Sequence, residues 1–252
     1  MYLGRTTPWI KHVPGPVPPR HQLVCFPYAG GGASFYRPWR AGLSPDTDLL
    51  VVQYPGREDR IDDPLVDDMG ELAELLGVEL APLLDLPFTF FGHSMGAAVG
   101  YEITRGWAES GHPTPDRLIV SSQFAPPRID VDDLLHRDDE GVLAELVRLG
   151  GIPADVRPGT DLAQLVVDLV RNDYRVLESG RFGADAPPLD VPVAAFCGAH
   201  DPSVTPRDVR EWADFTRRDF TEHVFDGGHF YPRERPAETV AAVAGLIARP
   251  AP

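Results

Sequence analysis

The motif Gly92-His93-Ser94-Met95-Gly96 constrains the fold of this chain more than any other feature. It follows an apolar run at 86–91 and precedes a helix-compatible stretch at 97–103. A serine at such a junction lies on a sharp strand-to-helix turn, the nucleophile elbow, and flanking glycines let the strand and helix approach closely. The N-terminus of the following helix offers unpaired N–H groups and a positive dipole end to a developing oxyanion. A plain glycine turn is the alternative, but the position between an apolar strand and a helix favours the elbow.

Strand-like and helix-like segments alternate along most of the chain. Apolar, strand-like runs lie at 22–26, 48–54, 88–91, 118–122, 191–197 and 220–225. Helices are expected at 35–43, at 67–84, after Ser94, after a capping box at 205–208, and at 237–248. Near-continuous apolar strands separated by amphipathic helices are typical of a mostly parallel sheet with helices on both faces. A chain of 252 residues favours one domain with insertions over two domains.

The alternation stops between residues 126 and 188, which hold two helical segments, 138–149 and 161–178, and no convincing strand. We expect this helical insertion at one sheet edge to act as a lid on a core formed by 21–125 and 189–252. Extra packing helices without a gating role are the alternative, because a sequence cannot show motion.

Residues 1–20 contain five prolines and lack the apolar core of a signal peptide, so they are expected to form a flexible arm.

Composition excludes several classes of function. A net charge of −15 argues against binding to nucleic acid or to an anionic membrane. No apolar run approaches the roughly 20 residues of a membrane span. Cys25 and Cys197 each lie in a strand-like run, which fits buried free thiols in a reducing cytoplasm better than a disulfide. The sequence has no H-E-x-x-H motif and no Cys/His cluster, so no metal site is expected.

Two residues can complete a catalytic triad with Ser94. A serine hydroxyl is a poor nucleophile until a base removes its proton, and the base needs an acid partner to fix its tautomer. Asp201 follows the strand at 191–197, and His229 follows the strand at 220–225. The order serine, acid, histidine is that of α/β-hydrolases, in which all three side chains meet at the carboxyl edge of the sheet.

His200 and Asp226 are the rivals for base and acid. His200 precedes the acid and leaves no later carboxylate equally well placed. Asp226 lies three residues before His229, yet Asp201 occupies the expected loop after a strand. His93 is expected to support the elbow, and the remaining histidines are expected to face solvent: His12, His21, His112, His136 and His223.

The oxyanion hole is expected to draw on the glycine-rich loop Phe26-Pro27-Tyr28-Ala29-Gly30-Gly31-Gly32-Ala33, here termed the oxyanion loop. One N–H should come from Met95, the residue after the nucleophile, and one from Ala29. A phosphate-binding loop is the competing interpretation, but neither G-x-x-x-x-G-K-[ST] nor G-x-G-x-x-G is present.

Five motifs, taken together and in order, resemble those of type II thioesterases, the discrete editing enzymes that accompany polyketide and nonribosomal peptide synthases. The motifs are Phe26-Pro27-Tyr28-Ala29-Gly30-Gly31, Tyr54-Pro55-Gly56-Arg57-Glu58, Gly92-His93-Ser94-Met95-Gly96, Gly198 with Asp201, and Gly227-Gly228-His229-Phe230. The resemblance covers nearly everything after residue 20. Tyr28 departs from it, because many members have histidine at that position.

The resemblance implies an α/β-hydrolase fold with a helical lid, and a cytoplasmic serine thioesterase that removes acyl groups from the phosphopantetheine arm of acyl or peptidyl carrier proteins. The catalytic residues would be Ser94, Asp201 and His229, with Met95 and Ala29 at the oxyanion, and no cofactor of the enzyme's own. A carboxylester hydrolase or a medium-chain fatty-acyl thioesterase would use the same machinery. A non-catalytic module that binds acyl carriers is an alternative of another class.

Carrier proteins are typically acidic, so docking on this acidic chain needs a local basic or apolar patch. The candidate arginines are Arg57, Arg60, Arg128, Arg171, Arg175 and Arg181.

Overall fold

The computed structural model describes residues 6–129, 134–182 and 187–248. Within them, seven strands form one sheet in the order β1-β3-β2-β4-β5-β6-β7. The strands are β1 (Ile10–Val13), β2 (His21–Phe26), β3 (Thr47–Val52), β4 (Phe88–His93), β5 (Arg117–Ser121), β6 (Val193–Gly198) and β7 (Phe220–Phe225). Strands β2 to β7 are parallel, and β1 runs antiparallel to β3 at the edge. The mostly parallel sheet is therefore as predicted.

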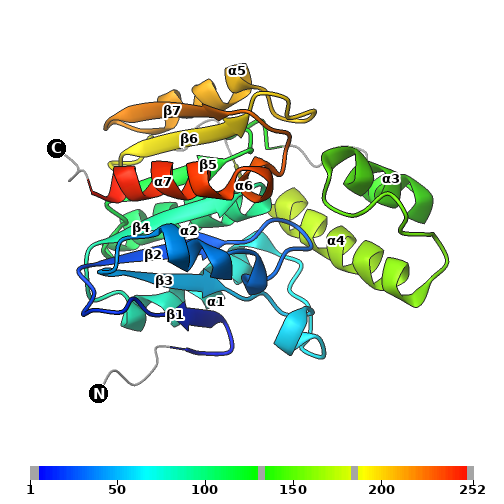
Figure 1. The fold of residues 1–252 in the computed structure, drawn as a ribbon, viewed down its shortest axis with the longest axis horizontal. Coiled ribbons are helices and arrows are strands. Elements are labelled where there is room, and N and C mark those ends of the chain that lie inside the picture. The colour runs from blue at the N-terminus through cyan, green and yellow to red at the C-terminus, as the bar shows by residue number, and fades with distance from the viewer. Residues whose placement is uncertain (1–5, 130–133, 183–186, 249–252) are drawn as a thin grey trace.

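Helices cover both faces of the sheet (Figure 1). Helices α1 (Met69–Leu80) and α2 (Met95–Ser110) pack on one face, and α7 (Pro236–Ile247) packs on the other with the 3₁₀ segment Arg37–Gly42. Because side chains alternate across a strand, each β strand contributes to both layers. In β2, Val24 and Phe26 join the core with α1 and α2, while Leu23 and Cys25 join the core with α7.

The expected helix at 35–43 is formed instead as two 3₁₀ segments, Ala33–Phe35 and Arg37–Gly42. The capping box before α5 (Pro206–Val209) is present as predicted, with Thr205 and Asp208 bonding each other's backbone N–H. A short helix that was not predicted, α6 (Tyr231–Glu234), follows the loop after β7 that carries His229.

The helical insertion contains α3 (Asp139–Leu149) and α4 (Asp161–Ser179), close to the predicted segments. Both begin at a side-chain cap, Asp138 and Thr160. The two helices share a small apolar cluster, and the C-terminal half of α4 continues into the main core through Val176 and Leu177. Figure 1 shows α3 and α4 at one end of the sheet, beyond the start of α2. The boundaries at 126 and 188 and the lid role stay predictions, and residues 130–133 and 183–186 lie outside the described residues.

The prediction of a flexible arm at 1–20 is wrong for residues 10–13, which form β1. Ile10 is fully buried and pairs with Val52 through β1. The side chain of His12 is also buried, with Nε2 2.9 Å from Oδ2 of Asp48. The prolines obscured this strand, but four of the five follow it, so they end β1 rather than prevent it. Residues 1–5 lie outside the described part of the chain.

Three histidines expected in loops belong to strands: His12 in β1, His21 in β2 and His223 in β7. Cys25 and Cys197 are buried free thiols, as predicted. In the described part of the chain, no helix combines the length and apolar character needed to cross a membrane.

Candidate active site

Ser94 occupies a strained turn between β4 and α2. Its backbone has φ 52° and ψ −122°, a conformation rare for a residue with a side chain. The N–H of Ser94 donates to the carbonyl of Ser121 at 2.8 Å, which ties the turn to the end of β5. A Cβ at Gly96 would lie 2.1 Å from the carbonyl oxygen of Phe26, and one at Gly92 would lie 2.2 Å from that of Gly96. Only glycine therefore fits on either side of this serine.

Asp201 and His229 come together from the ends of β6 and β7. Nδ1 of His229 lies 2.9 Å from Oδ2 of Asp201, and both side chains are buried. The other carboxylate oxygen of Asp201 accepts the N–H groups of Ser203 and Val204. Burial opposes the charge of Asp201, but the hydrogen bond and charge of His229, together with these two N–H groups, hold its pKa below the usual value. The carboxylate therefore stays ionised and fixes Nδ1 as the protonated ring nitrogen.

The backbones of the two loops touch, which explains the glycines around the pair. A Cβ at Gly198, the last residue of β6, would lie 2.2 Å from the carbonyl oxygen of Gly228. The loop that carries Asp201 therefore lies in direct backbone contact with the loop that carries His229.

The two rival residues lie together elsewhere. Nε2 of His200 is 3.5 Å from Oδ1 of Asp226, and both side chains are more than two-thirds exposed. Asp226 also pairs with Arg235. The structure thus joins His229 to Asp201 and joins His200 to Asp226 at the surface.

His93 links the elbow to His229. Its ring is fully buried, and the ring centroids of His93 and His229 are 5.1 Å apart. Nδ1 of His93 lies 2.9 Å from the hydroxyl of Ser121, which in turn lies 2.5 Å from the hydroxyl of Tyr231. Burial, and then the nearby His229, lower the pKa of His93 well below its usual value, against a smaller opposing effect of Asp201. His93 is therefore a neutral packing residue beneath the turn, as the sequence suggested.

The oxyanion loop lies directly over the start of α2, because Gly96 packs against the carbonyls of Phe26 and Pro27. Several of its N–H groups already have protein acceptors: Gly30 donates to Asp173 of α4 at 2.7 Å, Gly31 to the carbonyl of Tyr28 at 2.8 Å, and Ala33 to the side-chain oxygen of Gln53 at 2.8 Å. Within the described residues, the N–H groups of Ala29 and Met95 have no protein acceptor. Two unpaired donors close to the elbow are what an oxyanion hole requires.

Tyr28, the residue before Ala29 in the oxyanion loop, packs beside the elbow and the histidine loop. Its ring packs edge-on against His93 at 5.9 Å, Phe230 at 4.7 Å and Phe35 at 5.1 Å between centroids. Burial raises the pKa of Tyr28, so its phenol remains protonated near neutral pH.

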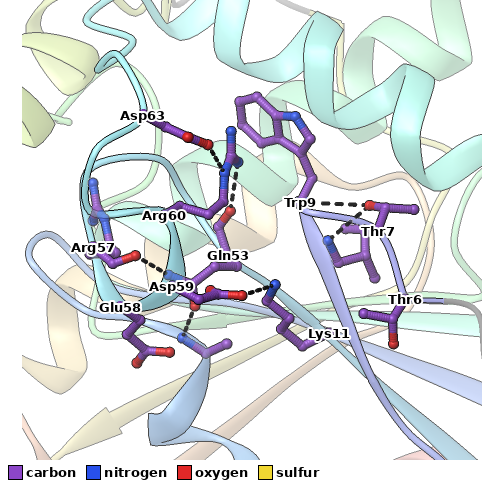
Figure 2. A network of polar contacts seen from close by, with 12 residues as sticks. Thr6, Thr7, Trp9, Lys11, Gln53, Arg57, Glu58, Asp59, Arg60 and Asp63 are labelled. Carbon is purple, nitrogen blue, oxygen red and sulfur yellow. Dashed lines mark hydrogen bonds and ion pairs between the residues drawn. The ribbon is translucent and has the colours of Figure 1, made fainter.

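Two of the arginines considered for docking are buried. Arg57 forms a bidentate ion pair with Asp173 of α4, and Arg60 bonds Asp63 while its guanidinium lies 3.9 Å from the centroid of the Trp9 ring. Figure 2 shows how Gln53 joins these residues: its side-chain NH₂ donates to the backbone carbonyl of Arg57, and its backbone carbonyl accepts from the Arg60 guanidinium. Both arginines are buried in contacts within the chain, so neither is a good candidate for the docking patch.

Asp173 is a residue that the sequence interpretation missed, although a signal was present. It lies three residues after Val170 and four before Leu177, on the buried face of α4. A charge on such a stripe needs a partner.

The residues that the structure describes include no group of three or more His, Cys, Asp or Glu side chains that could hold a metal ion.

Comparison with known proteins places the chain in a family. A model of the thioesterase domain matches residues 21–248. A probable cadicidin biosynthesis thioesterase of Streptomyces griseus is 38% identical over 83% of this chain, and the match spans 58% of that relative's length. The structure of the type II thioesterase BorB from the borrelidin biosynthetic cluster is 34% identical, with a TM-score of 0.83 over 98% of this chain and 99% of that one.

A second solved structure agrees. YbtT, a type II thioesterase from the yersiniabactin NRPS/PKS biosynthetic pathway, is 32% identical, with a TM-score of 0.82 over 94% of this chain and 97% of that one. The predicted α/β-hydrolase fold is thereby confirmed, and the residues matched by the family model include the elbow, the acid loop and the histidine loop. The chain belongs to the thioesterase family of α/β-hydrolases and is a thioester hydrolase that resembles the type II thioesterases.

Proposed function

We propose that this protein is a serine thioesterase that edits polyketide or nonribosomal peptide biosynthesis by hydrolysing acyl thioesters held on the phosphopantetheine arm of carrier proteins. Ser94 is the nucleophile, His229 the base and Asp201 the acid. The observation that carries the proposal is the buried pair of His229 and Asp201, with the His229 ring 5.1 Å from the ring of His93, the residue before the strained Ser94. The similarity to BorB and YbtT supports the substrate class.

Acylation begins when Oγ of Ser94 attacks the thioester carbonyl carbon and Nε2 of His229 takes the hydroxyl proton. Asp201 stabilises the imidazolium through Nδ1–H. The carbonyl oxygen becomes an oxyanion that accepts the N–H groups of Met95 and Ala29. The C–S bond then breaks, and His229 gives its proton to the departing sulfur, which becomes a free thiol and leaves His229 neutral. With a thiol pKa of about 8.5, this departure needs less help from the proton than that of an amine would.

Deacylation reverses the roles. His229 removes a proton from water, the hydroxide adds to the acyl-Ser94 carbonyl, and the serine leaves with the proton held by His229. The products are a free acid and the free phosphopantetheine thiol, so no cofactor of the enzyme's own is needed.

The carrier protein is expected to approach from the end of the sheet that carries the helical insertion. Among the arginines considered for docking, Arg175 and Arg181 are exposed on or just after α4. Arg128 and Arg171 are engaged with acidic residues of the chain itself. Free buried thiols fit the cytoplasmic location that such a partner implies.

The decisive experiment assays hydrolysis of carrier proteins loaded with a panel of acyl groups, for the wild type and for Ser94→Ala. The variant should fold and should lose activity by at least about a thousandfold, because removal of a catalytic serine disables the whole triad. A fluorophosphonate should label the wild type at Ser94 alone. Full activity in Ser94→Ala would refute the assignment, and failure of the folded wild type to be labelled would favour a non-catalytic binding module.

Rates on acyl thioesters and p-nitrophenyl esters of equal chain length separate a thioesterase from a carboxylester hydrolase. The triad treats both carbonyls alike, so a preference must come from the leaving group and its binding. Free medium-chain acyl thioesters cleaved as fast as carrier-bound ones would point to the fatty-acyl branch instead.

A further inference from the structure

The carboxylate of Asp173 joins the helical insertion to the oxyanion loop. Oδ2 accepts two hydrogen bonds, from the N–H of Gly30 at 2.7 Å and from a guanidinium nitrogen of Arg57 at 2.6 Å. Oδ1 accepts from the second terminal nitrogen of Arg57 at 2.8 Å. The side chains of Asp173 and Arg57 are only 3% and 6% exposed, so this ion pair is shielded from solvent and salt.

Arg57 also bonds the oxyanion loop directly. The guanidinium nitrogen that bonds Oδ2 also lies 3.3 Å from the carbonyl oxygen of Gly31, and Nε donates to the carbonyl of Pro55. The N–H and C=O of two consecutive loop residues are thus held by one buried ion pair. Gly30 adopts φ +79°, so the loop turns sharply at the residue that follows Ala29.

We infer that Asp173 and Arg57 are positioning residues that set the direction of the Ala29 N–H in the oxyanion hole, and that the helical insertion thereby completes the catalytic site. This inference rests on the proposed function, in which Ala29 is an oxyanion donor. The peptide between Ala29 and Gly30 is fixed at its Gly30 end by Asp173. Release of that end lets the loop rotate, which moves the adjacent N–H away from the developing charge.

Asp173→Asn tests the inference with a synthetic N-acetylcysteamine thioester, which avoids any effect on carrier docking. Both carboxylate oxygens of Asp173 accept hydrogen bonds, so the NH₂ group of the new amide meets a donor of Gly30 or Arg57 in either orientation and a hydrogen bond is lost. We expect kcat per active site to fall by about tenfold to a hundredfold, as misplacement of an oxyanion donor predicts, while KM changes less than twofold. The inhibition constant of an acyl trifluoromethyl ketone, which forms an oxyanion on Ser94, should rise by the same factor as kcat/KM falls.

A second variant guards against misfolding caused by a buried arginine without a counter-ion. The double substitution Arg57→Met with Asp173→Leu removes both charges at similar volume, which proteins commonly tolerate. It should show the same loss of kcat and the same weaker inhibition. Asp168→Asn, five residues earlier on the exposed face of α4, is the matched control and should leave both constants unchanged.

Fluorophosphonate titration of active sites separates positioning from general stability. A merely structural role would lower the fraction of titratable enzyme, but kcat per titrated site and the inhibition constant would stay at wild-type values, and that result would overturn the inference. If the wild type itself neither reacted with the fluorophosphonate nor cleaved the thioester, the proposed function would fail instead.

Discussion

Nδ1 of His229 lies 2.9 Å from Oδ2 of Asp201, and the two side chains are 5% and 0% exposed. The pair comes from two adjacent parallel strands, β6 and β7, whose following loops touch at Gly198 and Gly228. Because the bonded ring nitrogen must carry the proton, the other nitrogen is the one available to accept a proton from a nucleophile. The geometry therefore fixes the tautomer that acyl transfer requires.

Asp201→Asn should lower kcat by about a thousandfold to ten-thousandfold at neutral pH, because an amide can favour the wrong imidazole tautomer. Steady-state assay on a synthetic acyl thioester measures the loss. Asp226→Asn, which alters the exposed carboxylate near His200, is the control and should stay within about twofold of the wild type, since surface groups rarely matter to a buried site. If Asp226→Asn lowered kcat more than Asp201→Asn, Asp226 rather than Asp201 would be the catalytic acid.

The elbow and the positions of strands β2 to β7 along the chain were predictable because they depend on local patterns. Gly92, Ser94 and Gly96 sit at fixed spacing between an apolar strand and a helix, and the structure supplies steric reasons for both glycines. Strand β1 was missed because a four-residue strand beside several prolines carries little periodic signal. Its partner β3 (Thr47–Val52) also lies far along the sequence, so no local pattern announces the pairing.

The ion pair of Arg57 and Asp173 was not predictable for a related reason. Its partners are separated by 116 residues, and no local rule connects them. Arg57 in a loop reads as a surface cation, and only the fold reveals that α4 covers it. The sequence favoured Asp201 over Asp226, and the geometry agrees, because Asp201 bonds His229 while Asp226 lies near His200 at the surface.

Gly96→Ala should destabilise the protein by about 3 kcal/mol or more, because the new methyl group would overlap backbone atoms that cannot move aside. Gly106→Ala is the control on the same helix. Nothing lies within 4 Å of its Cβ position, so alanine should stabilise α2 by up to about 1 kcal/mol. Urea unfolding followed by circular dichroism measures both. Equal stability of the two variants would contradict the steric account of the elbow.

Ser122, just after β5, adopts φ 48°, and its buried hydroxyl has no partner among the described residues. A left-handed conformation costs a residue with a Cβ about 1 kcal/mol or more relative to glycine. Ser122→Gly should therefore be more stable than Ser122→Ala by about 1 kcal/mol, since both remove the hydroxyl and only glycine relieves the backbone. Thermal and urea unfolding of the two variants provide the comparison, and a more stable alanine variant would show that the strain is absent.

His21 should make the protein less stable in mild acid. Burial lowers its pKa from 6.5 to about 4, against a smaller opposing effect of Asp46. Between pH 6.5 and about pH 4, His21 is protonated in the unfolded chain but not in the folded protein. The free energy of unfolding therefore decreases as the pH is lowered through this range, by about 3 kcal/mol in total. His21→Gln keeps a partner for Thr89 but cannot titrate. The difference in unfolding free energy between the wild type and this variant should shift by that amount between pH 7 and pH 4. A difference that does not vary with pH would mean that His21 charges freely in the folded state.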